Sequence, residues 1–184
     1  TFQVGDRVLV NRLVYHFRPI ERGDVVVFDG TDSFVPAGEQ VSVNPIAAAA
    51  TWLGRSVGLV QPEGTDFIKR VIGVGGDTVA CCDAEGRVTV NGVPLQEESY
   101  LYPGDAPSDQ AFEVVVPEGM MWVMGDHRSN SADSRAHLGD PGGGMVPQGQ
   151  VVGRAMNVLW PIPRIGSVPI PETFAGIPTS GSVG

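Results

Sequence analysis

The sequence has almost no lysine and no long apolar run. Twelve of its 184 residues are Lys or Arg, and Lys69 is the only lysine. No stretch of about 18 apolar residues occurs, so we expect no segment that spans a membrane. The 21 acidic residues outnumber the basic ones and give a net charge of −9. Because no basic stripe is present, we do not expect nucleic acid as a partner.

Cysteine is scarce as well. The only two cysteines are neighbours, Cys81 and Cys82. Neighbouring cysteines rarely pair with each other because the ring that they would close is strained. Two thiols also fall short of the four ligands that zinc takes. We therefore expect structural or free thiols, and neither a metal site nor a cofactor.

Strand signals dominate the sequence. They are short β-branched segments bounded by Gly, Pro, Asp or Asn, at residues 7–10, 24–28, 67–74, 87–90, 112–116, 120–124 and 151–160. The pair Asn91 and Gly92 favours a tight hairpin turn, since both tolerate positive φ. One Ala-rich segment, residues 45–59, is a helix candidate. The pattern predicts a mostly-β fold with several small antiparallel sheets.

The densest polar segment is residues 125–135, directly after the apolar strand 120–124. It contains the pattern Gly-Asp-x-Arg-x-x-Ser-x-Asp-Ser-Arg. A rigid strand that ends in such a cluster can position a functional loop. Taken alone, the segment is more typical of an ordinary polar turn with surface ion pairs.

Three further segments occur in a fixed order ahead of it, at residues 4–12, 22–28 and 69–77. Together the four resemble the conserved boxes of type I signal peptidases, which are membrane-bound Ser–Lys endopeptidases that cut signal peptides from exported proteins. The resemblance runs from Thr1 to about Pro163. It implies a location at the cell membrane, with the catalytic domain on the extracytoplasmic side.

The chemistry of lysine agrees with this resemblance. A serine hydroxyl is a poor nucleophile until a base takes its proton, and a lysine with its usual pKa of about 10.4 is rarely neutral at pH 7. Burial among apolar groups lowers that pKa, and Lys69 follows Phe67 and Ile68 and precedes the apolar pair at residues 71–72. By resemblance, Lys69 is the general base and Ser131 orients its amine. The resemblance also implies two supporting ion pairs, Asp126 with Arg70 and Asp133 with Arg135.

The nucleophile of this family belongs to a Ser-Met-x-x-Thr motif that runs into the first Gly-Asp strand. Thr1 matches the Thr of this motif, so the resemblance places the serine upstream of Thr1. We interpret the sequence as a fragment that lacks this upstream part. A protein made only of residues 1–184 is then expected to be inactive. Ser180 and Ser182 faintly echo the motif, and we interpret them as part of a low-complexity tail.

Signal peptides carry small residues before the cleaved bond, which requires shallow apolar pockets. By resemblance, the substrate lies alongside residues 66–69 as an added strand, and the substrate-binding candidates are Phe2, Val8, Asp66, Phe67 and Ile68. Residues 46–60 are a candidate for contact with the membrane surface, or alternatively a helix packed on the core.

The motifs also suggest how the chain is divided. The boxes flank a middle stretch, so we expect a catalytic core of residues 1–77 and 113–163 with a smaller inserted β lobe at 78–112. Residues 164–184 are rich in Pro, Gly and Ser, and we expect a tail that cannot build a core and is extended over the surface or mobile.

Two other functions remain open. One is a Ser–Lys protease of the repressor-cleaving type, which shares related β architecture. The other is a non-catalytic extracellular β module that binds peptides. Sequence upstream of Thr1 would separate all three, because a Ser-Met pair after an apolar span favours the peptidase.

Overall fold

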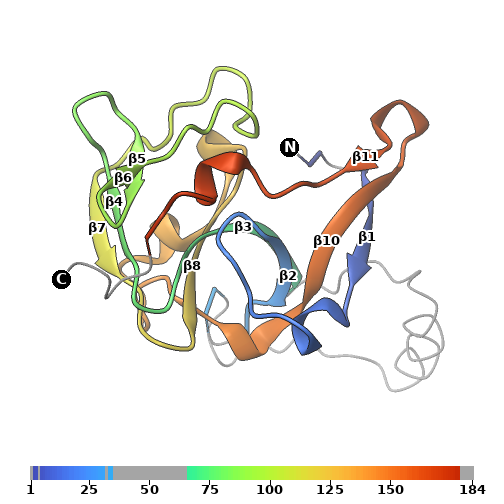
Figure 1. The fold of residues 1–184 in the computed structure, drawn as a ribbon, viewed down its shortest axis with the longest axis horizontal. Coiled ribbons are helices and arrows are strands. Elements are labelled where there is room, and N and C mark those ends of the chain that lie inside the picture. The colour runs from blue at the N-terminus through green and yellow to red at the C-terminus, as the bar shows by residue number, and fades with distance from the viewer. Residues whose placement is uncertain (1, 4, 32, 35–65, 179–184) are drawn as a thin grey trace.

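The strands of the computed structural model form two antiparallel sheets (Figure 1). The structure describes residues 2–3, 5–31, 33–34 and 66–178. Thr1, the segment 45–60, Ser180 and Ser182 lie outside the described residues, and so do the expectations that concern them. The mostly-β fold with antiparallel sheets that the sequence predicts is confirmed.

The larger sheet has seven strands, in the order β1-β10-β2-β3-β8-β9 with β11 paired to β10. Their bounds are β1 Arg7–Asn11, β2 Val25–Asp29, β3 Asp66–Val74, β8 Met120–Met124, β9 Val146–Pro147, β10 Val151–Trp160 and β11 Gly166–Ser167. Strands β2, β3 and β10 are rich in β-branched residues, which pack well on a pleated surface.

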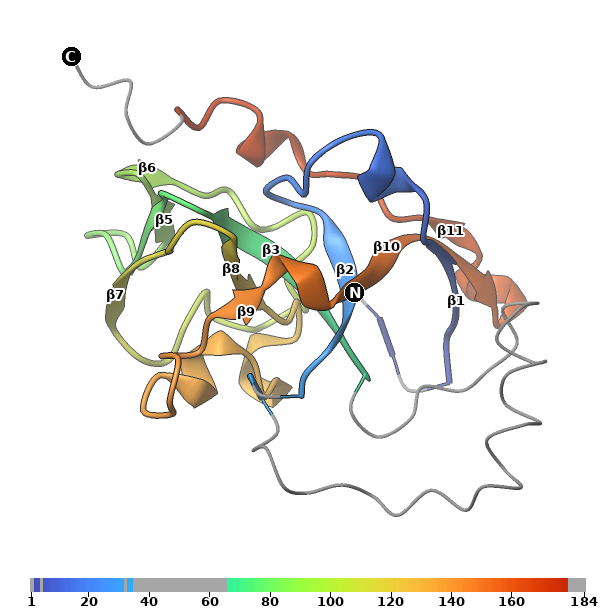
Figure 2. The same ribbon diagram turned by 90° about the horizontal axis from the view of Figure 1, so that it is seen from below.

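The smaller sheet has four strands, in the order β6-β5-β4-β7. Their bounds are β4 Thr78–Cys81, β5 Val88–Val90, β6 Val93–Pro94 and β7 Phe112–Val115. The expected hairpin is confirmed: Val90 pairs with Val93, and Asn91 and Gly92 between them have φ values of 53° and 78°. Figure 2 shows this sheet on one side of β3 and β8, with β1 and β10 on the other.

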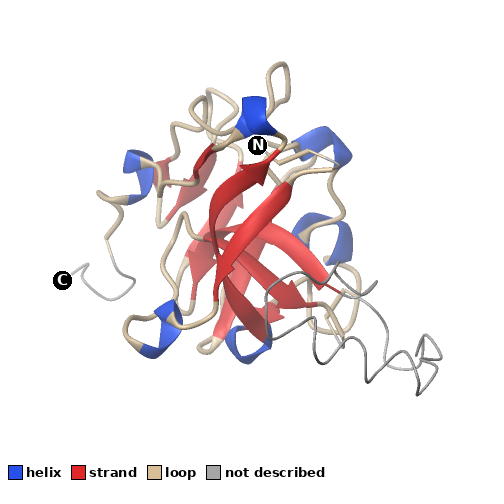
Figure 3. Ribbon diagram, turned by 90° about the vertical axis from the view of Figure 1, so that its right-hand side faces the viewer, coloured by secondary structure: helices blue, strands red, loops and turns tan. Residues whose placement is uncertain are grey.

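The helices of the described residues are single 3₁₀ turns at the periphery of the sheets (Figure 3). They are η1 Val14–His16, η2 Arg128–Asn130, η3 Ser134–His137, η4 Gln148–Gln150, η5 Ile162–Arg164 and η6 Glu172–Phe174. Within the described part of the chain, none of them has the length and apolar character needed to cross a bilayer.

Strand β8 lies between two apolar clusters and contributes to both. Successive side chains of a strand point to opposite faces. Trp122 and Met124 accordingly join one cluster with residues of the smaller sheet, while Met121 and Val123 join the other with residues of β2 and β3. Because β8 is buried on both faces, its C-terminal end and the loop that follows are held rigidly at the middle of the molecule.

The aspartate of each Gly-Asp box forms an ion pair with an arginine, which is distant in the sequence in three of the four pairs and six residues earlier in the fourth. The four pairs are Asp6–Arg164, Asp24–Arg18, Asp77–Arg22 and Asp126–Arg70. Each carboxylate accepts two hydrogen bonds from its guanidinium, a geometry that fixes both position and orientation. The boxes therefore contain ion pairs that hold the fold together, as well as the candidate catalytic residues.

Two findings go beyond or against the expectations from the sequence. Cys81 and Cys82 form a disulfide across a cis peptide bond, with Cα atoms 2.9 Å apart, so the expectation that these neighbouring cysteines stay unpaired is wrong. The segment after residue 163 also contributes to the core, since Phe174 and Ile177 are buried in the cluster that holds Trp122. Single apolar residues in a Pro-rich segment suffice to anchor it. The division into core, lobe and tail stays a prediction.

Candidate active site

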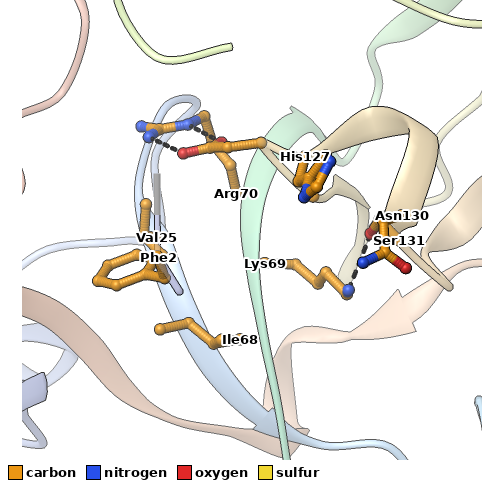
Figure 4. Close-up of a pocket in the computed structure, with 10 residues that line it drawn as sticks. Phe2, Val25, Ile68, Lys69, Arg70, His127, Asn130 and Ser131 are labelled. Carbon is orange, nitrogen blue, oxygen red and sulfur yellow. Dashed lines mark hydrogen bonds and ion pairs between the residues drawn. The ribbon is translucent and has the colours of Figure 1, made fainter. Parts of the chain in front are cut away.

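Lys69 and Ser131 meet in a cavity of about 170 Å³ at the junction of β3 with the loop after β8. The Lys69 Nζ donates a hydrogen bond of 2.9 Å to Ser131 Oγ (Figure 4). The cavity is lined by Phe2, Val25, Ile68, Lys69, Arg70, Gly125, Asp126, His127, Asn130 and Ser131. Two residues that are 62 positions apart in the chain thus share one site, as the motifs predict.

The surroundings of Lys69 favour its neutral form. Burial lowers the pKa of Lys69 from its usual 10.5, because a charged amine loses its hydration there. The carboxylates of Asp133 and Asp126 act in the opposite direction, while Arg135 adds to the lowering, and the net shift is downward. A lysine whose pKa is lowered in this way is neutral more often at neutral pH than an exposed lysine is, and only the neutral amine can accept a proton.

The approach of Ser131 to Lys69 depends on Gly125. A Cβ atom at position 125 would overlap Ser131 Oγ and would lie 3.7 Å from Lys69 Nζ. Gly125 also donates its N–H to Asp133 Oδ2 at 2.9 Å. The glycine that opens the 125–135 box is therefore a steric requirement of the site.

Both ion pairs that the resemblance implies are present. Arg70 donates to the two carboxylate oxygens of Asp126 at 2.8 and 2.7 Å, and Arg135 donates to those of Asp133 at 2.9 Å each. Burial alone would raise the pKa of Asp133, but the hydrogen bonds and charge of Arg135, together with the Gly125 N–H, lower it overall. Asp133 is therefore a fixed anion that anchors the loop carrying Ser131.

A second set of contacts, which the sequence analysis missed, holds this loop against the chain between β6 and β7. Buried Arg128 donates to the two oxygens of buried Glu97 at 2.5 and 3.1 Å, and Tyr100 Oη donates to Glu97 at 2.6 Å. The ring of Tyr102 stacks on His127, with centroids 3.9 Å apart. Arg128 belongs to the recognised box, but no local pattern identifies Glu97, 31 residues away, as its partner.

The substrate-binding candidates lie at several places. Phe2 and Ile68 line the cavity. Phe67 packs against Phe28 and Phe34. Val8 and Asp66 are not among the residues that line this cavity; Val8 pairs with Val158 of β10, and Asp66 pairs with Asp29 of β2.

One edge of β3 is paired with another described strand only from Arg70 onward. On one side, β2 pairs with β3 from Asp66 to Arg70. On the other side, β8 pairs with β3 only from Arg70 to Val74. Among the described strands, none pairs with Phe67, Ile68 and Lys69 on that second edge. An extended peptide can pair with such an edge, and it would lie next to the Lys69 amine.

Comparisons with known proteins agree with this geometry. The family model described as "Signal peptidase, peptidase S26" matches residues 1–160. The chain belongs to this signal peptidase family. The repressor-cleaving type is therefore not the family of this chain.

Relatives of the chain include bacterial proteins that are named signal peptidase I. A probable signal peptidase I of Mycobacterium leprae is 41% identical, over 90% of this chain and 64% of the relative. Signal peptidase I of Mycobacterium tuberculosis is 40% identical, over 90% and 60%. That of Leptolyngbya laminosa is 34% identical, over 95% and 70%. A solved signal peptidase I from Enterococcus faecalis is 26% identical, with a TM-score of 0.45 over 74% of this chain and 97% of the other. The chain spans about 60% of the length of the first two relatives.

Proposed function

We propose that this chain is the catalytic part of a membrane-associated serine endopeptidase that removes signal peptides from exported proteins. The observation that carries the proposal is the partly buried Lys69, with its lowered pKa and its hydrogen bond to Ser131. Family membership supports the substrate class. The free edge of β3 beside Phe67 and Ile68 supports binding of the signal peptide as an added strand.

In the proposed reaction, neutral Lys69 takes the proton of a serine hydroxyl as its oxygen attacks the scissile carbonyl. The C–N bond then breaks, and the Lys69 ammonium returns the proton to the departing amine. Water, deprotonated by Lys69, releases the signal peptide from the acyl-enzyme. Ser131 orients the amine, and the pairs Arg70–Asp126 and Asp133–Arg135 hold the walls of the site.

The nucleophile that we propose is the serine of a Ser-Met-x-x segment directly before Thr1. Ser131 is the rival, because its Oγ already lies 2.9 Å from Lys69 Nζ. The test is cleavage of a signal-peptide substrate by residues 1–184, with and without an added Ser-Met-x-x segment. We expect cleavage only with the added segment, and loss of it when the added serine becomes alanine. Turnover by residues 1–184 alone, above a Lys69→Ala control, would assign the nucleophile to a serine within the chain.

Contact with the membrane surface is the second part of the proposal. Four exposed apolar residues lie within seven positions of the chain, at the end of β10 and around η5: Leu159, Trp160, Ile162 and Ile165. Ile162 and Ile165 are 67% and 58% exposed. Contiguous exposed apolar residues mark contact surfaces, and tryptophan is enriched at membrane–water interfaces.

Binding to lipid vesicles tests this part. We expect residues 1–184 to sediment with phospholipid vesicles, and the double variant Ile162→Ser, Ile165→Ser to do so much less. Phe17→Ser is the matched control, because Phe17 is 86% exposed but follows η1, beyond the far end of β1. Equal loss of binding in the control and the double variant would remove the role given to η5.

A further inference from the structure

A second, larger hollow continues from the catalytic cavity. It has a volume of about 1080 Å³ and shares three lining residues with that cavity, Phe2, Arg70 and Asp126. The two spaces therefore meet at the Arg70–Asp126 ion pair. Sites that bind drug-sized ligands measure about 300–1,000 Å³, so this groove has room for several residues of a peptide.

The walls of the groove are fixed by hydrogen bonds. One wall is residues 96–100 and the other is residues 163–173, which run from η5 past β11 toward the smaller sheet (Figure 1). The Gln96 N–H donates to Thr173 Oγ1 at 2.8 Å and so joins the two walls. The Val168 N–H donates to Met156 O at 2.8 Å and ties the second wall to β10. The groove is thus part of the folded structure.

The pairing of β3 directs a bound peptide toward this groove. A peptide that follows the free edge of β3 along Phe67 and Ile68 reaches Lys69, and from Arg70 onward β8 occupies the same edge. The peptide must therefore leave the edge at Lys69, where the reacting bond lies. The larger hollow opens at that point, across the Arg70–Asp126 pair.

The charges at the groove are predominantly negative. Glu98 and Glu172 line it and are exposed, and within the described residues neither side chain has an ion-pair partner. The two arginines of the lining are already neutralised, Arg70 by Asp126 and Arg164 by Asp6. A basic side chain of a bound peptide is therefore attracted to this groove, and an acidic one is repelled.

We propose that this groove binds the part of the substrate that follows the cleaved bond, in extended form, and that Glu98 and Glu172 make it favour basic over acidic side chains there. This inference rests on the proposed function, since it assigns the second half of the same substrate.

Amide chemical shifts of residues 1–184 with two peptides test the inference without any need for turnover. One peptide ends at the cleaved bond, and the other continues for about six residues, which span roughly 20 Å when extended. We expect both to shift Ile68 and Lys69, and only the longer one to shift Ser99 and Val168.

The possible outcomes separate the two proposals. If neither peptide shifts Ile68, the proposed function fails. If the longer peptide shifts Ile68 but leaves Ser99 and Val168 unchanged, the groove assignment alone is overturned. If the amide shifts of Ser99 and Val168 change with protein concentration in the absence of peptide, the occupant of the groove is a second copy of this chain. That result would also overturn the groove assignment.

Charge reversal tests the predicted preference. At low salt, the wild-type chain should bind a longer peptide with lysine in the extension about two- to fivefold more tightly than one with glutamate, the range of exposed charge pairs. The double variant Glu98→Lys, Glu172→Lys should reverse this order. Glu113→Lys is the control, since Glu113 is exposed on β7 and does not line the groove. An unchanged order in the double variant, or the same reversal in the control, would refute the role of the two glutamates.

Discussion

The amine of Lys69 and the hydroxyl of Ser131 are joined by a hydrogen bond of 2.9 Å, although one residue belongs to β3 and the other to the loop after β8. The bond is possible because β3 and β8 are paired neighbours and because Gly125 leaves room for the serine.

Lys69→Arg should abolish cleavage as fully as Lys69→Ala in a protein that carries the Ser-Met-x-x segment before Thr1. A guanidinium stays protonated and cannot accept the serine proton. Ser131→Ala should be less damaging, at roughly 1–3 kcal/mol, because it removes an orienting hydrogen bond and leaves the base in place. The measurement is kcat/KM on a signal-peptide substrate. Near-normal cleavage by the arginine variant would remove Lys69 from the mechanism.

Gly125→Ala should greatly reduce activity. The added methyl group would overlap Ser131 Oγ, so the serine must move away from Lys69. A matched control is Gly149→Ala, where a Cβ atom meets no other atom within 4 Å and φ is not in the left-handed region. We expect kcat to fall in the first variant and to stay near wild type in the second. Equal activity of the two variants would show that the Lys69–Ser131 contact is dispensable.

Glu97→Ala should destabilise the chain by about 3–5 kcal/mol, since it leaves the buried Arg128 without its carboxylate. The neighbouring Glu98→Ala provides the control: Glu98 is exposed, and its replacement should change the free energy of unfolding by only about 0.5 kcal/mol or less. Urea unfolding measures both. Similar stabilities of the two variants would contradict the role given to the Glu97–Arg128 pair.

A feature of the fold or of the site could be predicted where neighbouring residues in the sequence form a recognisable pattern. The strands and the Asn91–Gly92 hairpin follow from short β-branched segments and turn residues. The meeting of Lys69 with Ser131 is implied by the resemblance of four boxes taken together in their fixed order. Glu97 and Arg128 could not be paired in this way, because neither lies in a pattern that points to the other. Buried Phe174 was missed for a similar reason, since a lone aromatic in a Pro-rich segment has no periodicity.

Stability should depend on pH through Lys69. Its pKa is lower in the folded chain than the usual 10.5, so between these two values the unfolded chain binds more protons. The free energy of unfolding then rises with pH across that interval and levels off above about 10.5. Lys69→Met lacks this contribution. We expect the difference in stability, wild type minus Lys69→Met, to increase with pH up to that limit. A difference that is constant or falls with pH would show that the pKa is not lowered by folding.

The most direct test of the account is the pKa of Lys69 itself. Because Lys69 is the only lysine of the chain, a protein grown with ¹³Cε-labelled lysine gives a single side-chain signal, which can be followed through a pH titration. The account predicts that this signal titrates below 10.5, and that the midpoint returns toward 10.5 when the protein is unfolded in urea. A midpoint at or above 10.5 in the folded protein would contradict the proposal that Lys69 is the general base.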